Sequence, residues 1–288
     1  MLALLIIDTI HFEDLSKNLQ PVYDQCGNPD IQKITVLVTP AINSANLLDD
    51  VLGYLYTKCR TAVNGYSKNI DVLFNVDVGR YIATTECNLI LAPKRLHLQH
   101  ENLTQYEIEY AKELEGCSVD SEPKQDFYVE GYYKVTALGG TFDHIHDGHK
   151  ILLSVAAFLT SQKLIIGVTD QELLENKKFK QYLQTFEKRV EYVLQFLKLV
   201  KPDVEYQIVP IRDVCGPTGT VPEIEALIVS EETVQGAGIV NKTRKERGLE
   251  KLEVFVVNIL GGGKDWEEKL SSTYIRELES TAASKSSA

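Results

Sequence analysis

Residues 139–149 read GGTFDHIHDGH and carry three of the six histidines of this 288-residue chain. An apolar run, residues 135–138, precedes the segment, and a stretch with apolar residues at helical spacing, residues 150–159, follows it. The segment is therefore predicted to be a glycine-rich turn between a strand and a helix. Free backbone N–H groups at the start of a helix attract anions. This turn, with its H-x-G-H pattern at 146–149, predicts a phosphate-binding site.

The chain around this turn alternates between strand and helix patterns from residue 132 to residue 279. The clearest helical pattern spans residues 183–200. Strands rich in Val and Ile that alternate with amphipathic helices predict an α/β fold, a Rossmann-like doubly wound parallel sheet. Ligands then bind beyond the carboxyl ends of the strands, where the strand order reverses. The loop 215–222 is expected to border that site. The predicted strands are Val135–Leu138, Leu164–Val168, Val204–Val209, Ala226–Val229 and Leu252–Ile259.

Residues 1–115 are predicted to form a smaller N-terminal α/β domain. A helix is expected from Ser44, as its N-cap, to Cys59. The domain has no glycine-rich phosphate loop and no histidine cluster, so its role is not evident from the sequence. The polar segment 116–131 is predicted to be a linker, and residues 280–288 a disordered tail. The predicted strands are Leu2–Ile7, Ile34–Val38, Ile70–Val76 and Asn88–Leu91.

The composition is that of an ordinary globular protein, with 44% apolar and 25% charged residues. The five cysteines form no C-x-x-C pair, which indicates a reducing compartment, and we expect the cytoplasm. We expect neither a presequence nor a membrane span. The net charge is −11: residues 1–131 contain 19 acidic and 10 basic residues (−9), and the rest contains 22 and 20 (−2). This acidity argues against nucleic acid as a partner.

Two motifs give the chain a resemblance to a known superfamily. GGTFD at 139–143 followed by HDGH at 146–149 resembles the signature of the nucleotidyltransferases, and SSTYIR at 271–276 resembles their S-S-T/S-x-x-R element. The motifs occur in the expected order, more than 120 residues apart. Within the superfamily, residues 133–280 are similar to eukaryotic, fungal-type phosphopantetheine adenylyltransferases. The supporting stretches are GGTFDHIHDGHKILL, IIGVTDQELLENKKF, VPIRDVCGPTGTVPEIEALIVSEETVQGAGIVNKTR and KLSSTYIRE.

The resemblance implies an enzyme that joins ATP to 4′-phosphopantetheine, giving dephospho-coenzyme A and pyrophosphate. Mg²⁺ is expected to enter with ATP, since it prefers phosphates and water to an all-protein cage, and no metal site is expected in the protein itself. The sequence contains no G-x-x-x-x-G-K-[ST] phosphate loop. We therefore expect the adenylyltransferase activity alone, without an additional dephospho-coenzyme A kinase activity. Association with other enzymes of coenzyme A synthesis, or with further copies of the chain, is compatible with the resemblance.

The resemblance also assigns roles to individual residues. Lys177 and Lys178 would neutralise charge between the two substrates, with Lys177 preferred. Thr141 would bind the acceptor phosphate and would also take part in ATP binding. The nucleotide side would include Ser230, Glu231, Asn241 and Arg244. The expected catalytic residues are His146, His149, Lys177 and Arg276, and the expected ATP-binding residues are Gly140, Thr141, Phe142, His146, His149, Ser271, Ser272, Thr273 and Arg276.

Other interpretations stay open at this stage. His146 and His149 could pack together at a helix start or join His144 in a metal site; His144 itself is interpreted as a turn residue, and Asp143 as a turn former. Lysines in a polar stretch are usually solvated. The acceptor could be nicotinamide mononucleotide, FMN or another small phosphate. A non-catalytic scaffold that binds coenzyme A enzymes is a third hypothesis, motivated by the N-terminal domain.

Overall fold

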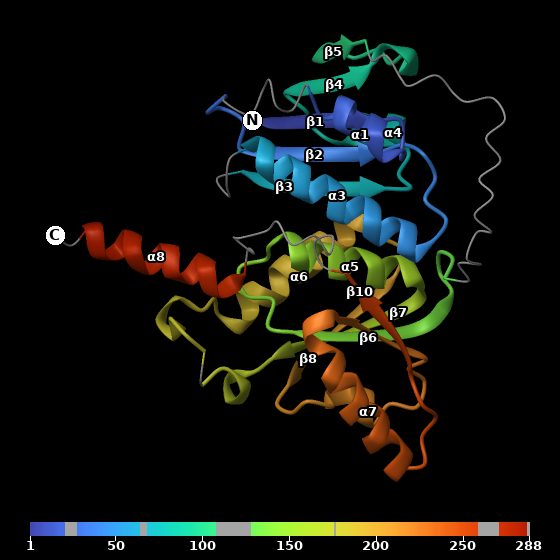
Figure 1. The fold of residues 1–288 in the computed structure, drawn as a ribbon, viewed down its shortest axis with the longest axis vertical. Coiled ribbons are helices and arrows are strands. Elements are labelled where there is room, and N and C mark those ends of the chain that lie inside the picture. Colours follow the sequence, from blue (N-terminus) through green and yellow to red (C-terminus); the bar gives the residue numbers. More distant parts are fainter. Residues whose placement is uncertain (21–27, 64–67, 108–127, 176, 259–270, 287–288) are drawn as a thin grey trace. The chain divides into compact units, whose positions relative to one another are not determined.

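The computed structural model describes residues 1–20, 28–63, 68–107, 128–175, 177–258 and 271–286 (Figure 1). The chain divides into two compact units, residues 1–127 and 128–288. Residues 116–127 of the expected linker lie outside the described residues.

The second unit is built on one parallel sheet. Its strands, in chain order, are β6 (Tyr133–Gly140), β7 (Thr160–Thr169), β8 (Glu205–Ile211), β9 (Ala226–Ser230) and β10 (Glu253–Val257). They lie side by side in the order β10-β9-β6-β7-β8, and every pairing is parallel. Numbered within the unit, this is the 3-2-1-4-5 order of a Rossmann-like fold, with its switch point between β6 and β9. The predicted fold class is confirmed, and each predicted strand has its counterpart.

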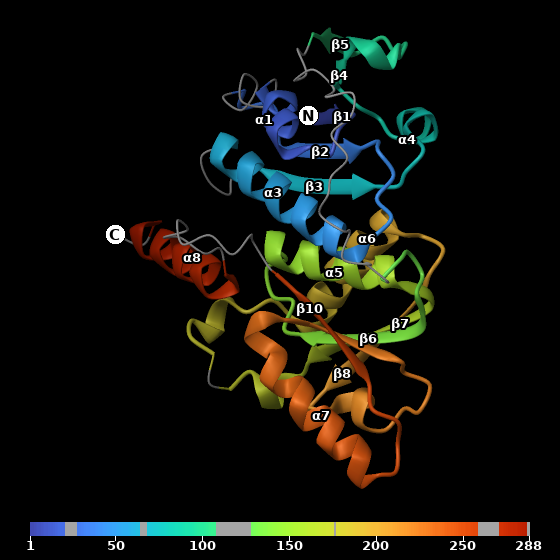
Figure 2. The same cartoon turned by 45° about the vertical axis from the view of Figure 1, so that its right-hand side comes forward.

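Helices cover both faces of this sheet. Figures 1 and 2 show α5 (Asp147–Leu159) and α6 (Phe186–Val200) on one face and α7 (Val234–Glu246) on the other. The expected helix 183–200 begins three residues later, because Thr185 caps it: its hydroxyl accepts from the Lys188 N–H at 3.3 Å. Four short 3₁₀ turns complete the connections: η2 (Gln171–Leu173), η3 (Lys180–Tyr182), η4 (Gly216–Gly219) and η5 (Glu231–Thr233).

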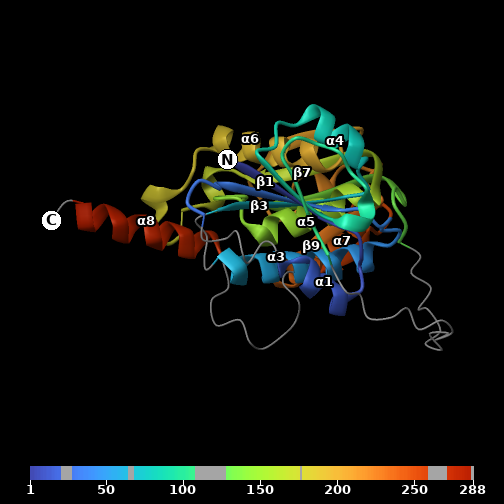
Figure 3. The ribbon, with the colours of Figure 1, turned by 90° about the horizontal axis from the view of Figure 1, so that it is seen from above.

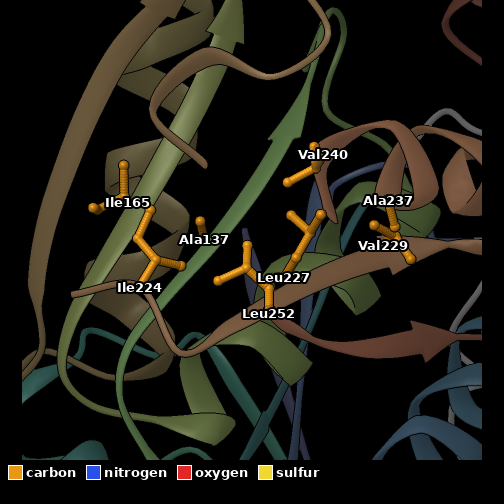
Figure 4. Close-up of a cluster of buried hydrophobic side chains, with 8 residues drawn as sticks. All are labelled: Ala137, Ile165, Ile224, Leu227, Val229, Ala237, Val240 and Leu252. Atoms are coloured by element: carbon orange, nitrogen blue, oxygen red, sulfur yellow. The ribbon is translucent and has the colours of Figure 1, made fainter. Parts of the chain in front are cut away.

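An apolar cluster holds α7 against the sheet. Side chains from three strands, the preceding loops and α7 meet there, and each is at most 6% exposed. Burying a side chain of this kind contributes roughly 1.5–3 kcal/mol, so the cluster fixes α7 against β9. Its members, labelled in Figure 4, are Ala137, Ile165, Ile224, Leu227, Val229, Ala237, Val240 and Leu252.

The C-terminal segment differs from the expectation of a disordered tail from residue 280. Helix α8 runs from Ser272 to Ser286, and residues 287–288 lie outside the described residues. The Thr281 hydroxyl donates to the Glu277 carbonyl at 2.9 Å within the helix, and two alanines follow it, the residue with the highest helix propensity. The polar composition of the segment therefore describes a solvated helix.

The first unit repeats the same strand order. Its strands are β1 (Leu2–Ile7), β2 (Lys33–Val38), β3 (Asn69–Phe74), β4 (Leu89–Pro93) and β5 (Leu103–Tyr106), in the parallel order β3-β2-β1-β4-β5. Figure 3 shows α1 (Phe12–Asn18) and α3 (Ala45–Val63) on one side of the sheet and α4 (Val78–Thr84) on the other; η1 (Lys94–Leu96) follows β4.

Sequence analysis identified most of this first unit. The Ser44 hydroxyl accepts from the Leu47 N–H at 3.1 Å, which confirms the predicted N-cap. The helices α1 and α4 and the strand β5 were missed, because each is seven residues or shorter and carries little periodic signal. Among the described residues of the whole chain, no helix is long and apolar enough to cross a membrane.

We predict that Gly167→Ala destabilises the second unit. A Cβ at Gly167 would lie 2.8 Å from Cγ2 of Ile211, a contact that forces the sheet or the side chain to move. Overpacking of this kind costs roughly 1–3 kcal/mol. Chemical denaturation of the two proteins measures the difference in the free energy of unfolding.

Gly238→Ala is the matched control, because a Cβ at that position of α7 meets nothing within 4 Å. It should stabilise the protein by about 0.5–1 kcal/mol through helix propensity. Equal effects of the two substitutions would contradict the packing argument.

Candidate active site

A cleft of about 490 Å³ opens where β6 ends, at the switch point of the second sheet. It collects three segments that the sequence separates widely: the turn after β6, the loop at Lys177 and the start of α8. The end of β9 and the first residues of the loop that follows it complete the lining. The lining residues are Gly139, Gly140, Thr141, Phe142, His146, Gly148, His149, Leu152, Lys177, Ser230, Glu231, Glu232, Thr233, Ser271, Ser272, Thr273 and Arg276.

The turn after β6 owes its shape to a buried aromatic ring. Phe142 is fully buried and has φ of 51°. A Cβ at Gly140 would lie 3.0 Å from that ring, so a side chain at this position would push Phe142 out of place. The ring in turn lies 5.3 Å from the His149 ring, measured between centroids. Gly140 and Phe142 thus set the position of His149 in the first turn of the next helix.

His146 and His149 stack on one another at the start of α5. Their ring centroids are 3.9 Å apart, at an interplanar angle of 26°. Burial lowers the pKa of His146 to about 4. Burial, together with the neighbouring His146, lowers the pKa of His149 well below its usual value. Both imidazoles are therefore neutral at pH 7 in the ligand-free protein.

The hydrogen bonding of these rings indicates their tautomer. Nδ1 of His146 and Nδ1 of His149 are buried, and neither has a partner among the described residues. A buried N–H without an acceptor is costly, so the single proton of each neutral ring belongs on Nε2. Because both residues line the cleft, the two rings are arranged as neutral hydrogen-bond donors toward an anion.

His144 is separated from this pair. Its ring nitrogen Nε2 lies 3.0 Å from the Tyr182 carbonyl, and Nδ1 lies 3.6 Å from Glu279. Its backbone has φ of 45°, and its N–H donates to Gln184 at 2.9 Å. The interpretation of His144 as a turn residue agrees with this geometry.

The two lysines differ in their placement. Lys177 lines the cleft, and its backbone N–H donates to Leu174 at 3.1 Å. Lys178 does not line it; its carbonyl accepts from Nε of Arg276 at 3.0 Å. Of the two expected substrate-bridging lysines, Lys177 is thus the one at the cleft.

Helix α8 begins with the predicted serine element. The Ser271 hydroxyl accepts from the Tyr274 N–H at 3.3 Å, and the Ser271 carbonyl accepts from the Ile275 N–H at 3.1 Å. Ser271 is therefore the N-cap of α8, and the helix directs its free N–H groups toward the cleft that Ser271, Ser272 and Thr273 line. Arg276 lines the same cleft from one turn further on, with its side chain almost fully buried.

Two expected nucleotide contacts are corrected. Arg244 is fully buried, and its guanidinium donates to the carbonyls of Thr218, Val221 and Glu250 at 2.6–2.9 Å. Asn241 exchanges two hydrogen bonds with Leu252, at 2.9 and 3.1 Å. Neither lines the cleft. Both hold α7 to its surroundings, a role that a polar side chain on a helix does not disclose in sequence.

Ser230 and Glu231, the other two expected nucleotide contacts, do line the cleft. Ser230 ends β9 and forms a capping box with Thr233: its N–H donates to the Thr233 hydroxyl at 3.1 Å. This fixes the loop at the cleft's edge.

Sequence reasoning missed Arg189. This side chain is 2% exposed, and Nη1 donates to the carbonyls of Thr141 and Thr169 at 2.8 and 3.0 Å. It thereby fixes Thr141 at the mouth of the cleft. A signal was available: Arg189 precedes Val193 and Leu197 on the buried stripe of α6, where a charged residue needs partners.

A second pocket of about 420 Å³ adjoins the cleft. The two share Gly139, Gly140, Thr141 and Thr233, and the remainder of the second pocket is mainly apolar. The loop expected to border the site does so, through three of its residues. The residues that line only this pocket are Leu138, Gly167, Thr169, Leu173, Ile211, Asp213, Val214, Cys215, Pro217, Thr218, Leu227, Val229, Gly236, Ala237 and Val240.

The arrangement suits the binding of anions beside an apolar group. Neutral donors, helix N–H groups and a lysine surround one compartment, and an apolar compartment opens beside it at Thr141. In the part of the chain that the structure describes, no group of three or more His, Cys, Asp or Glu side chains is placed to hold a metal ion.

Comparison with known proteins agrees with this site. Residues 137–278 match the cytidylyltransferase-like family model. Together, the fold and the cleft define a nucleotidyltransferase. The chain is 44% identical over 269 residues to the phosphopantetheine adenylyltransferase of Saccharomyces cerevisiae, covering 88% of this chain and 85% of that protein. The chain belongs to the phosphopantetheine adenylyltransferase family.

Archaeal relatives match about half of the chain. The phosphopantetheine adenylyltransferase of Pyrococcus furiosus is 38% identical over 144 residues, covering 50% of this chain and 88% of that protein. The one from Pyrobaculum aerophilum is 35% identical over 156 residues, covering 54% of this chain and 97% of that protein. The matched length is most of each archaeal protein but only about half of this chain.

We predict that the buried histidines make the protein less stable in weak acid. The folded pKa of His146, about 4, lies below the unfolded value near 6.5. Between these values the unfolded chain binds more protons, so the free energy of unfolding falls as the pH drops below about 6.5. For His146 the loss at about pH 5.5 is on the order of 1 kcal/mol. Urea denaturation at neutral pH and at about pH 5.5 measures this loss of stability.

His146→Asn removes this titration and should reduce the fall in stability between neutral pH and about pH 5.5. Carboxylates titrate equally in both proteins over this range, so the difference isolates the histidine. An identical fall in the variant would contradict the assignment.

Proposed function

We propose that this chain transfers the adenylyl group of ATP to 4′-phosphopantetheine, giving dephospho-coenzyme A and pyrophosphate. An oxygen of the acceptor phosphate attacks the α-phosphorus of ATP, and the bond from that phosphorus to the bridging oxygen of pyrophosphate breaks. The observation that carries the proposal is the union of the histidine turn, Lys177 and the serine element in one cleft beside an apolar pocket. Family membership supports the choice of acceptor.

The protein's part in this reaction is alignment and charge stabilisation. His146 and His149 would donate from Nε2 to the phosphates of ATP, and the N–H groups at the start of α5 would add to the same field. Ser271, Ser272 and Thr273 would bind the outer phosphates. These donors gain strength as negative charge moves onto the leaving pyrophosphate.

Thr141 lies where the cleft and the apolar pocket meet, since it lines both. We assign it to the acceptor phosphate, with Lys177 neutralising the two substrates as they approach. The pantetheine arm of the acceptor would then occupy the apolar pocket between Ile211, Val229 and Val240. Mg²⁺ would arrive as the Mg·ATP complex and be held mainly by phosphate oxygens and water.

The cytoplasm is the compartment we propose. Among the described residues the cysteines Cys59, Cys87 and Cys215 are free thiols, as is usual in a reducing environment. Association with other enzymes of coenzyme A synthesis, or of the chain with itself, is part of the proposal. Light scattering of the purified protein measures the self-association.

We predict that pyrophosphate is released from ATP with 4′-phosphopantetheine as acceptor. With nicotinamide mononucleotide or FMN the rate should be lower by at least about 100-fold, because these acceptors lack the flexible pantetheine arm that we assign to the apolar pocket. A coupled pyrophosphate assay with each acceptor, and detection of dephospho-coenzyme A by mass spectrometry, provide the measurement. Turnover with another acceptor but none with 4′-phosphopantetheine would refute the assignment, and binding without turnover would favour the scaffold hypothesis.

We predict that His149→Ala lowers kcat by about 100- to 1000-fold, the usual effect of removing one donor to a developing negative charge. The fold should persist, since His149 lines the cleft and is not part of the hydrophobic core; circular dichroism checks this. His11→Ala, an exposed histidine of the first unit, is the control and should keep the wild-type rate. Wild-type turnover by His149→Ala would remove this histidine from the mechanism.

A further inference from the structure

The guanidinium of Arg276 is an unusual phosphate ligand, because protein groups already surround it. Nη1 donates to Oδ2 of Asp143 at 2.5 Å, Nε to the Lys178 carbonyl at 3.0 Å, and Nη2 to the Thr273 hydroxyl at 3.1 Å. The residue is 1% exposed. Three of the five N–H groups are used in this way, and with so little free surface the guanidinium has limited capacity to bind a ligand oxygen directly.

The three partners of Arg276 come from the three segments that form the cleft. Asp143 belongs to the turn that carries His146 and His149, the Lys178 carbonyl is one residue from Lys177, and Thr273 is in the serine element. These segments are far apart in sequence. One planar cation therefore joins all three at once, with the fork geometry that guanidinium provides.

Asp143 fixes the guanidinium from the other side. Its carboxylate is fully buried, and Oδ1 accepts from the Gln184 N–H at 2.9 Å while Oδ2 accepts from Arg276. Both oxygens are thus used in holding the protein together. The Gln184 side chain in turn accepts from the His144 N–H at 2.9 Å, so the turn after β6 is tied to the chain that leads into α6.

From this geometry we infer that Asp143 and Arg276 are positioning residues that hold the histidine turn, the Lys177 loop and the serine element in register for the two substrates. The inference rests on the proposed function of the cleft. It assigns to Asp143 a role in the reaction, and it changes the role of Arg276 from phosphate ligand to the link between the segments that carry the ligands. Loss of either partner leaves a buried charge without its counter-ion, so the three segments separate together.

The test compares Asp143→Asn, Arg276→Met and the double variant. Each single substitution should raise the KM for ATP by about 10-fold or more and lower kcat, because small displacements of aligned groups are costly in rate. The double variant should resemble the single ones, since both remove one shared interaction. Glu253→Gln is the matched control: this carboxylate binds the Tyr133 hydroxyl at 2.6 Å, at the amino ends of β6 and β10 and so at the opposite edge of the sheet, and its kinetics should be those of the wild type.

Two kinetic outcomes would overturn the inference. If Arg276→Met raises the KM for ATP and Asp143→Asn does not, Arg276 acts directly on the nucleotide. If both variants only lower the melting temperature and keep the wild-type kcat and KM at room temperature, the pair is purely structural.

Hydrogen exchange supplies a readout that does not depend on turnover. In ligand-free Asp143→Asn, amide exchange should rise together in residues 177–183 and 271–276, and Glu253→Gln should leave both unchanged. Asp143→Glu replaces Asp143→Asn if the latter does not fold, and the longer side chain should give the same paired increase. An increase in one segment alone, or in neither, would contradict the inference. Absence of dephospho-coenzyme A formation by the wild type would instead refute the proposed function, leaving this measurement valid.

Discussion

Parallel pairing of five strands is the constraint on which the second unit depends. Because every strand runs the same way, all five carboxyl ends lie at one edge of the sheet, and each connection must return across a face. After β8 the chain crosses to the far side of β6, so the connections diverge at the β6–β9 boundary. The turn after β6 therefore lies beside the end of β9, and α8 has only to reach the same edge for the cleft to be complete.

Buried charges then give this edge its definite shape. Arg189 fixes the Thr141 carbonyl, and Arg276 with Asp143 joins the turn to the loop and helix on the other side. At the surface, water would compete for these hydrogen bonds. Because the side chains are buried, that competition is absent. The histidines are treated differently: their Nδ1 atoms are left without partners among the described residues. The protein thus satisfies the groups that hold the site and leaves unsatisfied two groups that belong to it.

The sequence predicted the parts of this molecule that depend on local pattern. Runs of Val and Ile predicted the strands. The histidine turn and the serine element, each a short motif, predicted the cleft through their resemblance to the nucleotidyltransferases. It failed where a side chain's partner is distant. Arg244 was assigned to the nucleotide, yet its guanidinium binds three carbonyls that lie 6, 23 and 26 residues away in the sequence. Nothing in the local sequence around Arg244 distinguishes a carbonyl-binding cation from a phosphate-binding one.

The first unit has the same 3-2-1-4-5 strand order as the second. At its own switch point, between β1 and β4, the chain continues into Asp8 and Arg95, which form an ion pair with each other. The second unit has Gly139, Gly140 and Thr141 at the corresponding place. The two units thus share the order of their strands and differ in the residues at the switch point. Strand order therefore does not decide the chemistry at a switch point; the residues that end the first strand and follow it do.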